Sequence, residues 1–171
     1  MELGTKSVRI RPLQPDDSKK IAELANNRKI WLNVRDMFPH PFGESDAMKF
    51  IESKRLESPQ TTFGITYNRD LTGAIGLVLQ EDVYRYSAEL GYWIGEPFWN
   101  NGIATNALRL MITYAFEKLQ LKRLFAGVFE GNEASKKVLE KCGFEFEGIA
   151  QKAVFKNGLF LDEYRYVLLK R

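Results

Sequence analysis

Apolar and polar side chains follow one another along this chain with two different periods, which predict helices and short strands. Apolar residues at helical spacing predict helices through residues 21–25, 45–56, 107–119 and 132–142, with a less regular helical stretch over 28–37. Apolar or alternating runs bounded by turn residues predict strands at 8–11, 61–67, 72–79, 88–94, 124–129, 144–148, 153–156 and 161–169. The three strands between residues 61 and 94 are separated by short polar turns, which favours an antiparallel meander.

The residues between these segments predict how they begin and end. Asn157-Gly158 is a two-residue hairpin signal, and Asp16 or Asp17 can cap the helix that follows them. Phe38–Gly43 must be a loop, because two prolines bracket His40 and each disfavours helix in the residue before it.

Length and composition narrow the class of protein. A chain of 171 residues is long enough for one well-buried core, so we expect a single α+β domain over residues 1–171. The net charge is only +3, and no run of Lys and Arg suggests a nucleic-acid surface. One cysteine (Cys142) and one histidine (His40) argue against a disulfide framework and against a Cys/His metal site. The N-terminal sequence has no apolar signal core, and no apolar run approaches the roughly 18 residues of a membrane span. We therefore expect a cytoplasmic protein with no nucleic-acid or membrane partner.

The segment Glu89–Thr105 is the first candidate for chemistry. A strand leads into a turn and then into a long helix, and the small residues Gly102 and Ala104 let a ligand approach the backbone. The first N–H groups of a helix have no helical acceptor and lie at the positive end of its dipole, so they suit a pyrophosphate. An ordinary helix start with a glycine near its cap explains the same residues.

A second candidate lies at the start of the next helix. A buried strand ends at Glu130-Gly131, and Asn132 and Ser135 follow at the cap and in the first turn of that helix. Capping alone accounts for both residues. The functional alternative is that Asn132 binds the backbone of an extended cofactor arm and that Ser135 donates a hydrogen bond to a sulfur.

Together the two segments resemble the GNAT superfamily of acetyltransferases. Gly102 and Ala104 occupy the last two positions of a pattern similar to that family's acetyl-CoA motif, Arg/Gln-x-x-Gly-x-Gly/Ala. Trp99 stands at the Arg/Gln position, as in the branch that acetylates the N-termini of ribosomal proteins (the RimJ/RimL type), while Asn100 replaces a glycine of that branch. Asn132-x-x-Ser135 and Leu139–Phe144 resemble the family's Asn-x-x-Ser and Leu-x-Lys-x-Gly-Phe block, and the element order agrees over nearly the whole chain.

The resemblance implies a fold and a cosubstrate. The fold would be a mixed, mostly antiparallel sheet of about seven strands with about four flanking helices, in which the fourth and fifth strands splay apart. Acetyl-CoA would be the cosubstrate, with no metal. Its pantetheine arm would bind like an added strand at Trp93, Ile94 and Gly95. The residues expected around its pyrophosphate are Trp99, Asn100, Asn101, Gly102, Ile103, Ala104 and Thr105.

The resemblance also implies direct attack of an amine on the thioester, with no acyl-enzyme. Glu89 is the candidate base, acting directly or through a water. Strand alternation places Glu89, Gly91 and Trp93 on one face, although a surface or structural carboxylate is the alternative for Glu89. Ser135 would contact the leaving thiolate and Asn132 would hold the arm. His40 has a suitable ordinary pKa but lies in a loop, where a structural role is the simpler interpretation.

Two functional hypotheses follow. The first is an acetyl-CoA-dependent N-acetyltransferase whose acceptor is a protein N-terminus, a polyamine or another small amine. The second is a non-catalytic acetyl-CoA-binding or sensor domain. The aromatic C-terminal strands are compatible with a monomer or a homodimer.

Overall fold

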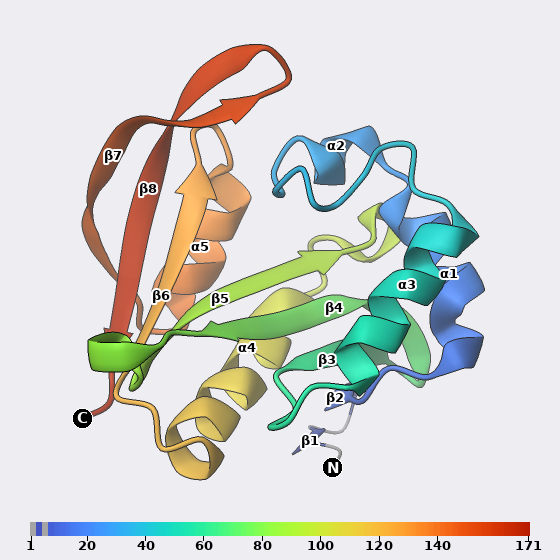
Figure 1. Cartoon of the computed structure of the whole chain (residues 1–171), viewed down its shortest axis with the longest axis horizontal. Helices are drawn as coiled ribbons and strands as arrows, with labels where there is room; N and C mark the ends of the chain where they lie inside the picture. Colours follow the sequence, from blue (N-terminus) through green and yellow to red (C-terminus); the bar gives the residue numbers. More distant parts are fainter. Residues whose placement is uncertain (1–2, 5–6) are drawn as a thin grey trace. The chain divides into compact units, whose positions relative to one another are not determined.

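The structure is a computed structural model that describes residues 3–4 and 7–171. The described residues group into two compact units, each built from separate stretches of the chain. The first unit holds Tyr92–Met111 and the described part of Met1–Gly76, and the second holds Leu77–Gly91 and Ile112–Arg171. The chain passes from one unit to the other within two strands, β4 and β5, and one helix, α4 (Figure 1). The single domain expected over residues 1–171 stays a prediction.

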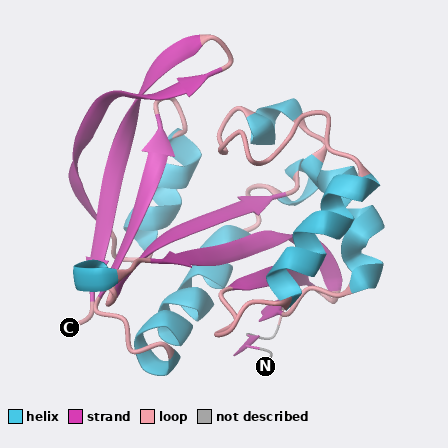
Figure 2. Ribbon diagram, in the orientation of Figure 1, coloured by secondary structure: helices cyan, strands magenta, loops and turns pink. Residues whose placement is uncertain are grey.

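Helices and strands follow one another in small groups along the chain (Figure 2). The strands are β1 (Leu3–Gly4), β2 (Val8–Arg11), β3 (Thr62–Tyr67), β4 (Asp70–Leu79), β5 (Ser87–Ile94), β6 (Arg123–Phe129), β7 (Glu145–Lys156) and β8 (Leu159–Leu169). The α-helices are α1 (Ser18–Ala25), α2 (Arg28–Trp31), α3 (Glu44–Arg55), α4 (Ile103–Thr113) and α5 (Glu133–Lys141). A π-helical turn, Tyr114–Lys118, continues α4, and short 3-10 turns cover Pro15–Asp17, Asp82–Tyr84 and Glu96–Phe98.

The strands form one mixed sheet in the order β1-β2-β3-β4-β5-β6-β8-β7. The pairs β1/β2, β2/β3, β3/β4, β6/β8 and β7/β8 are antiparallel, whereas β5 and β6 are parallel. The parallel register joins Ser87–Glu89 to Arg123–Phe125, at the beginning of both strands. This short register fits the expected splaying of the family's fourth and fifth strands, which are β5 and β6 here. The α+β class and the mixed sheet are confirmed.

The strands differ from the expectation in their number and at one boundary. Among the described residues there are eight strands, because Leu3–Gly4 adds a short strand at the edge. The strands predicted at 144–148 and 153–156 are one continuous strand, β7. The register shifts between Ala150 and Val154, where Lys152 has φ 51° and its N–H donates to Asp162 Oδ1 at 2.8 Å.

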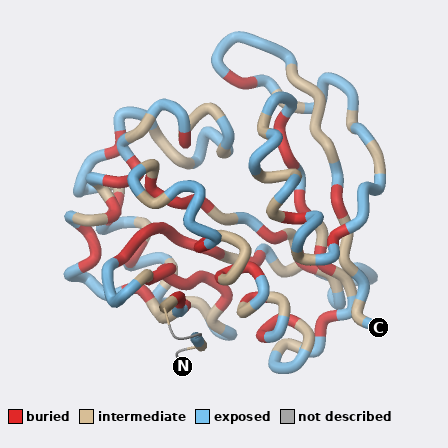
Figure 3. Tube along the Cα trace, turned by 180° about the vertical axis from the view of Figure 1, so that it is seen from behind, coloured by how far each residue is buried: buried red, intermediate tan, exposed pale blue. Residues whose placement is uncertain are grey.

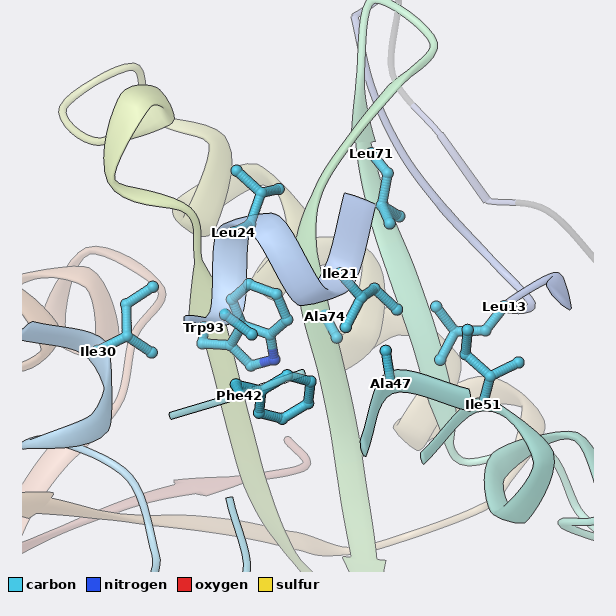
Figure 4. Packing of buried hydrophobic residues seen from close by; sticks show 11 residues of the cluster. Leu13, Ile21, Leu24, Ile30, Phe42, Ala47, Ile51, Leu71, Ala74 and Trp93 are labelled. Carbon is cyan, nitrogen blue, oxygen red and sulfur yellow. The ribbon is translucent and has the colours of Figure 1, made fainter. Parts of the chain in front are cut away.

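The core of the first unit brings α1 and α3 onto the sheet. Figure 4 shows Ile21 of α1, Ala47 and Ile51 of α3 and Trp93 of β5 in one apolar cluster. Ile21 and Ile51 are almost fully buried, and each such side chain stabilises the fold by roughly 1.5–3 kcal/mol. The helical spacing of apolar residues therefore identified the buried face of α1 and the buried Ala47 and Ile51 of α3, whereas Met48 on α3 and Leu56 at its end are exposed.

In the second unit, α5 packs on the face of β8 that carries Tyr164 and Tyr166. Tyr166 donates a hydrogen bond to Glu140 Oε1 at 3.3 Å, and Lys136 Nζ lies 3.5 Å from the centre of the Tyr164 ring. Burial and the neighbouring Glu140 raise the pKa of Tyr166. The hairpin that joins β7 to β8 is mostly exposed (Figure 3), and its turn at Asn157-Gly158 confirms the predicted hairpin.

Two expectations about the N-terminal helices are corrected. The stretch predicted over 28–37 is helical only to Trp31, because Asn33 and Val34 donate to carbonyls three residues back and the helix tightens into turns. Asp17 precedes α1 but does not cap it with its side chain. Its carboxylate instead accepts two hydrogen bonds of 2.8 Å from Arg11 and one of 2.7 Å from the Gln14 N–H.

Within residues 3–4 and 7–171, no helix has both the length and the apolar character needed to cross a membrane.

Candidate functional site

The turn after β5 is held by its own backbone. In the first unit, the Gly95 N–H donates to Thr72 O of β4 at 2.7 Å, and the Phe98 N–H donates to Gly95 O at 2.9 Å. The Trp99 N–H then donates to Glu96 O at 3.1 Å, and its indole Nε1 donates to Ile94 O at 2.6 Å. The residue at the motif's Arg/Gln position therefore supports the shape of the turn through its indole.

The start of α4 depends on two residues in the left-handed region. Asn100 has φ 62° and Gly102 has φ 70°, and a Cβ placed on Gly102 would meet nothing within 4 Å. The glycine is thus required by its backbone angle, and the space beside it is open. Asn100, Asn101 and Gly102 are exposed, while Ile103 is buried in the core.

Backbone groups supply the electrostatic character of this helix start. Lys and Arg are absent from the sequence between Trp93 and Leu108, so no side-chain cation in this stretch serves an anion. Helix geometry leaves the first N–H groups of α4 without helical acceptors, at the positive end of an 11-residue helix. This arrangement suits the pyrophosphate expected here.

The alternation of β5 separates the backbone groups that face β4 from those that face the other way. Ser87 and Gly95 both bond to the β4 side, through Ser87 O to the Gln80 N–H and through the Gly95 N–H to Thr72 O. Odd-numbered residues of β5, Trp93 included, therefore turn their backbone groups toward β4, while even-numbered ones such as Ile94 turn theirs away. Of the three residues expected to hold pantetheine, Ile94 has the suitable backbone direction.

The Trp93 side chain belongs to the core of the first unit. It is 9% exposed and meets the Phe38 ring edge-on, with the ring centres 5.7 Å apart. Phe38 in turn lies 4.8 Å from Phe42, so the loop predicted at Phe38–Gly43 is attached to β5 through aromatic contacts. Its fixed position could not be inferred from its proline-rich sequence.

In the second unit, Asn132 and Ser135 lie together at the start of α5. The Ser135 N–H donates to Asn132 Oδ1 at 3.2 Å, so the predicted N-cap is present. Gly131 before it has φ 88°. Asn132 uses its side-chain oxygen for this cap, and the other polar group of the same amide is the Nδ2 donor.

Glu89 also lies in the second unit, half-buried on β5 opposite Phe125 of β6. Its strand neighbours Ala88 and Leu90 are buried on the opposite face, as alternation predicts. Gly127 lies two residues beyond Phe125 and shares the face of Glu89. The Glu163 carboxylate of β8 fills the space above Gly127, since a Cβ there would lie 2.6 Å from Glu163 Oε2. A second carboxylate on this face was not predicted, because only the pairing of β6 with β8 places it there.

The remaining candidates have structural surroundings. His40 is exposed and its ring stacks on Trp31 with the ring centres 5.7 Å apart. Cys142 is half-buried at the C-cap of α5. Across the described part of the chain, no three His, Cys, Asp or Glu side chains are grouped so that they could hold a metal ion.

The structure adds one polar cluster that the sequence did not indicate. Glu96, in the turn after β5, accepts hydrogen bonds from Lys29 and Asn27 at the start of α2, and these bonds lower the pKa of its carboxyl. Its negative charge near the start of α4 is thereby paired with a lysine. The separation of these residues in sequence left no local signal.

The predicted site residues are divided between the two units. Trp93 to Thr105 belong to the first, and Glu89, Asn132 and Ser135 belong to the second.

Comparison with known proteins places these features in a family. The acetyltransferase (GNAT) domain matches residues 7–145. A Bacillus subtilis protein named "Putative ribosomal N-acetyltransferase YdaF" is 35% identical over 96% of this chain and 92% of its own. The spermidine N(1)-acetyltransferase of Escherichia coli is 27% identical over 96% of this chain and 87% of its own. A solved structure of RimL, a ribosomal L7/L12 alpha-N-protein acetyltransferase in complex with coenzyme A, shares the fold with a TM-score of 0.86 and 19% identity, covering 96% and 95% of the two chains. The family match over most of the chain, and a relative at this level of identity, establish that the protein belongs to the GNAT family and is an N-acetyltransferase.

Proposed function

We propose that this protein transfers the acetyl group of acetyl-CoA directly to a primary amine, on a protein N-terminus, a polyamine or another small amine. The observation that carries the proposal is the start of α4, where Gly102 has φ 70° beside open space at the N-terminal end of an 11-residue helix. A backbone cradle of this kind suits a pyrophosphate without needing a basic side chain.

Each part of acetyl-CoA has residues suited to it. The pyrophosphate would accept hydrogen bonds from N–H groups within Asn100–Thr105, next to Trp99. The pantetheine arm would lie along the end of β5 at Trp93–Gly95, with Ile94 supplying the N–H that turns away from β4, because its carbonyl already accepts from the Trp99 indole. Asn132 would donate its Nδ2 group to an amide carbonyl of the arm.

The chemistry assigned to the side chains is proton transfer and charge stabilisation. The amine nitrogen attacks the thioester carbonyl carbon, the new C–N bond forms, and the C–S bond breaks to release the thiolate. Glu89 accepts the proton that the amine loses, directly or through a water. Ser135 donates a hydrogen bond to the sulfur and stabilises the thiolate as it leaves.

The names of the relatives support more than one acceptor. A ribosomal N-acetyltransferase and a spermidine acetyltransferase both align with nearly all of this chain. We propose that residues 26–43 select the acceptor. A monomer or homodimer in the cytoplasm remains our prediction.

A non-catalytic acetyl-CoA-binding or sensor role is the alternative. It shares the start of α4 and differs only in the use of Glu89. The half-buried position of Glu89 on a sheet face, with Gly91 beside it on the same strand, favours the enzyme.

The test follows thiol release from acetyl-CoA with a panel of polyamines, amino acids and short peptides that differ in their N-termini. Acceptor-dependent release is expected, and Glu89→Gln should lower kcat by about 100-fold or more with unchanged acetyl-CoA affinity. Glu117→Gln, an exposed carboxylate after α4, is the matched control. A raised melting temperature with acetyl-CoA but no release with any amine would favour the sensor role, and neither binding nor release would refute the proposal.

A further inference from the structure

Glu96 connects two segments of the first unit that lie far apart in sequence. Its Oε2 accepts a hydrogen bond of 2.6 Å from Asn27 Nδ2, across 69 residues of chain. Its Oε1 forms an ion pair with Lys29, and its side chain is 37% exposed. Both contacts reach the first turn of α2, so one carboxylate holds the start of this helix.

Asn27 has two tasks in the same cluster. Its Oδ1 caps α2 by accepting from the Lys29 N–H at 2.8 Å and the Ile30 N–H at 3.3 Å. Its Nδ2 donates to Glu96. Because one rigid amide makes both sets of contacts, the orientation of the cap depends on the position of Glu96.

The two segments joined by Glu96 differ in their own stability. α2 has only four residues, Arg28–Trp31, and a helix of one turn is unstable without tertiary contacts. The turn that carries Glu96 keeps its backbone bonds to Thr72 and within Gly95–Trp99, and none of them uses the Glu96 side chain. Loss of the carboxylate should therefore loosen α2 and leave the turn in place.

α2 lies near the beginning of residues 26–43, a stretch that we call the acceptor segment. The stretch is tied back to its own start, since the Phe42 N–H donates to Asn26 Oδ1 at 3.0 Å and His40 stacks on Trp31. Phe38 contacts Trp93 of β5, and the Ile30 and Phe42 side chains are buried in the core of the first unit. To these apolar attachments Glu96 adds polar contacts with Asn27 and Lys29.

We propose that Glu96 is a positioning residue that sets the affinity for the acceptor amine by holding the acceptor segment through Asn27 and Lys29. The inference rests on the proposed function, in which residues 26–43 bind the acceptor. Glu96 itself contacts neither the acceptor nor acetyl-CoA in this account. The ion pair with Lys29 also reduces the repulsion between the Glu96 carboxylate and an anion at the start of α4.

The test measures three quantities on the full chain for Glu96→Ala, Glu96→Gln and the control Glu23→Gln. Glu23 forms a comparable exposed pair with Lys20 at 3.1 Å on α1, away from the acceptor segment. For Glu96→Ala we expect amide hydrogen exchange in residues 26–43 to accelerate about tenfold, and the acceptor KM to rise about tenfold, as for loss of one hydrogen bond to a charged group. The acetyl-CoA Kd should change by less than about twofold, because the turn keeps its backbone bonds. Glu96→Gln should give an intermediate result, since the glutamine oxygen still accepts from Asn27.

Asn27→Asp provides a second route to the same loss. Aspartate keeps an oxygen for the helix cap but loses the Nδ2 donor and repels Glu96, so it should reproduce the effect of Glu96→Ala. Unchanged exchange in residues 26–43 would overturn the positioning role, as would an equal loss of acetyl-CoA affinity. If the wild-type protein acetylates no amine, the proposed function fails, and the exchange measurement still decides whether Glu96 holds α2.

Discussion

The start of α4 and the start of α5 both present first-turn N–H groups, but they are built in different ways. At α4, Asn100 and Gly102 bend the backbone through the left-handed region, and no Lys or Arg stands in the sequence between Trp93 and Leu108. At α5, the Ser135 N–H donates a hydrogen bond to the Asn132 side chain. One start therefore presents its backbone and the other presents side chains.

This difference suggests a division of labour in binding acetyl-CoA. Exposed N–H groups at the positive end of a helix favour an anion, so α4 suits the pyrophosphate. At the start of α5 the Ser135 N–H is already bonded to Asn132, and this cap holds both residues in defined positions. Their side chains therefore suit directional hydrogen bonds to the pantetheine arm and the sulfur of acetyl-CoA. The predictions below test this division, from the largest expected effect to the smallest.

Gly102→Ala should give the largest loss of acetyl-CoA affinity. An alanine at φ 70° is strained by about 1–2 kcal/mol, and its methyl group projects into the space where the phosphate would lie. We expect the Kd measured by calorimetry to rise about tenfold or more. Gly158→Ala, at φ 79° in the β7–β8 hairpin, is the matched control: it should lower the free energy of unfolding similarly and leave the Kd unchanged. Equal Kd values for Gly102→Ala and wild type would contradict the backbone cradle.

Ser135→Ala should affect the chemical step more than binding. Loss of one hydrogen bond to the developing thiolate should lower kcat about tenfold, with an acetyl-CoA Kd within about twofold of wild type. Stopped-flow thiol release with the best acceptor measures the effect. Ser53→Ala on α3, whose hydroxyl donates to Phe50 O at 2.8 Å, controls for the loss of a surface hydroxyl. An unaltered kcat would leave Ser135 with a structural role only.

Two substitutions of Asn132 separate capping from ligand binding. Asn132→Ala should lower the free energy of unfolding by about 1 kcal/mol through loss of the cap, and should also weaken acetyl-CoA binding. Asn132→Asp keeps a capping oxygen and should retain wild-type stability in urea titrations, while losing affinity because it lacks the Nδ2 donor. If the aspartate variant binds acetyl-CoA like wild type, Asn132 acts as a cap alone.

The smallest effect concerns the pH dependence of the first turn of α5. The hydrogen bond between Lys136 and Glu133 raises the pKa of Lys136 above its ordinary 10.5. Because the pKa of Lys136 is raised, the hydrogen bond between Lys136 and Glu133 stabilises the fold in full below pH 10.5. This stabilisation is lost as the pH rises through the pKa of Lys136 in the folded state. The difference in urea midpoint between wild type and Glu133→Gln should therefore be small at pH 8 and shrink further above pH 10.5. A difference that grows with pH would show that Glu133 acts through another group.

Local signals in the sequence were sufficient wherever one residue and its neighbours determine the structure. Asn132 was predicted as an N-cap and is one, and the positive φ of Gly102, Asn157 and Gly158 follows from residue types that tolerate the left-handed region. Helical spacing identified the buried face of α1, and the buried Ala47 and Ile51 of α3. The family's motifs lie in these local segments, which is why the resemblance could be drawn from the sequence.

Expectations were less accurate where distant segments compete for the same groups. Asp17 looked like a cap, but Arg11 and the Gln14 N–H bind its carboxylate. Trp93, Ile94 and Gly95 looked equivalent as a binding edge, but the pairing of β5 with β4 at Thr72 divides them by direction. A periodic pattern gives the face of a side chain, whereas the partner strand decides which backbone groups are already bonded.

The sequence by itself determined the order of helices and strands, the two helix starts with their Gly and Asn residues, and the membership of the GNAT family. Only the tertiary structure decided that Glu96 holds α2 through Asn27 and Lys29, and that Glu163 fills the space above Gly127 on the face of Glu89. The physical reason is the separation in sequence of the interacting residues. Capping and turn preferences act over a few residues. An ion pair across 67 residues, or a carboxylate over a glycine on the neighbouring strand, exists only after the chain has folded.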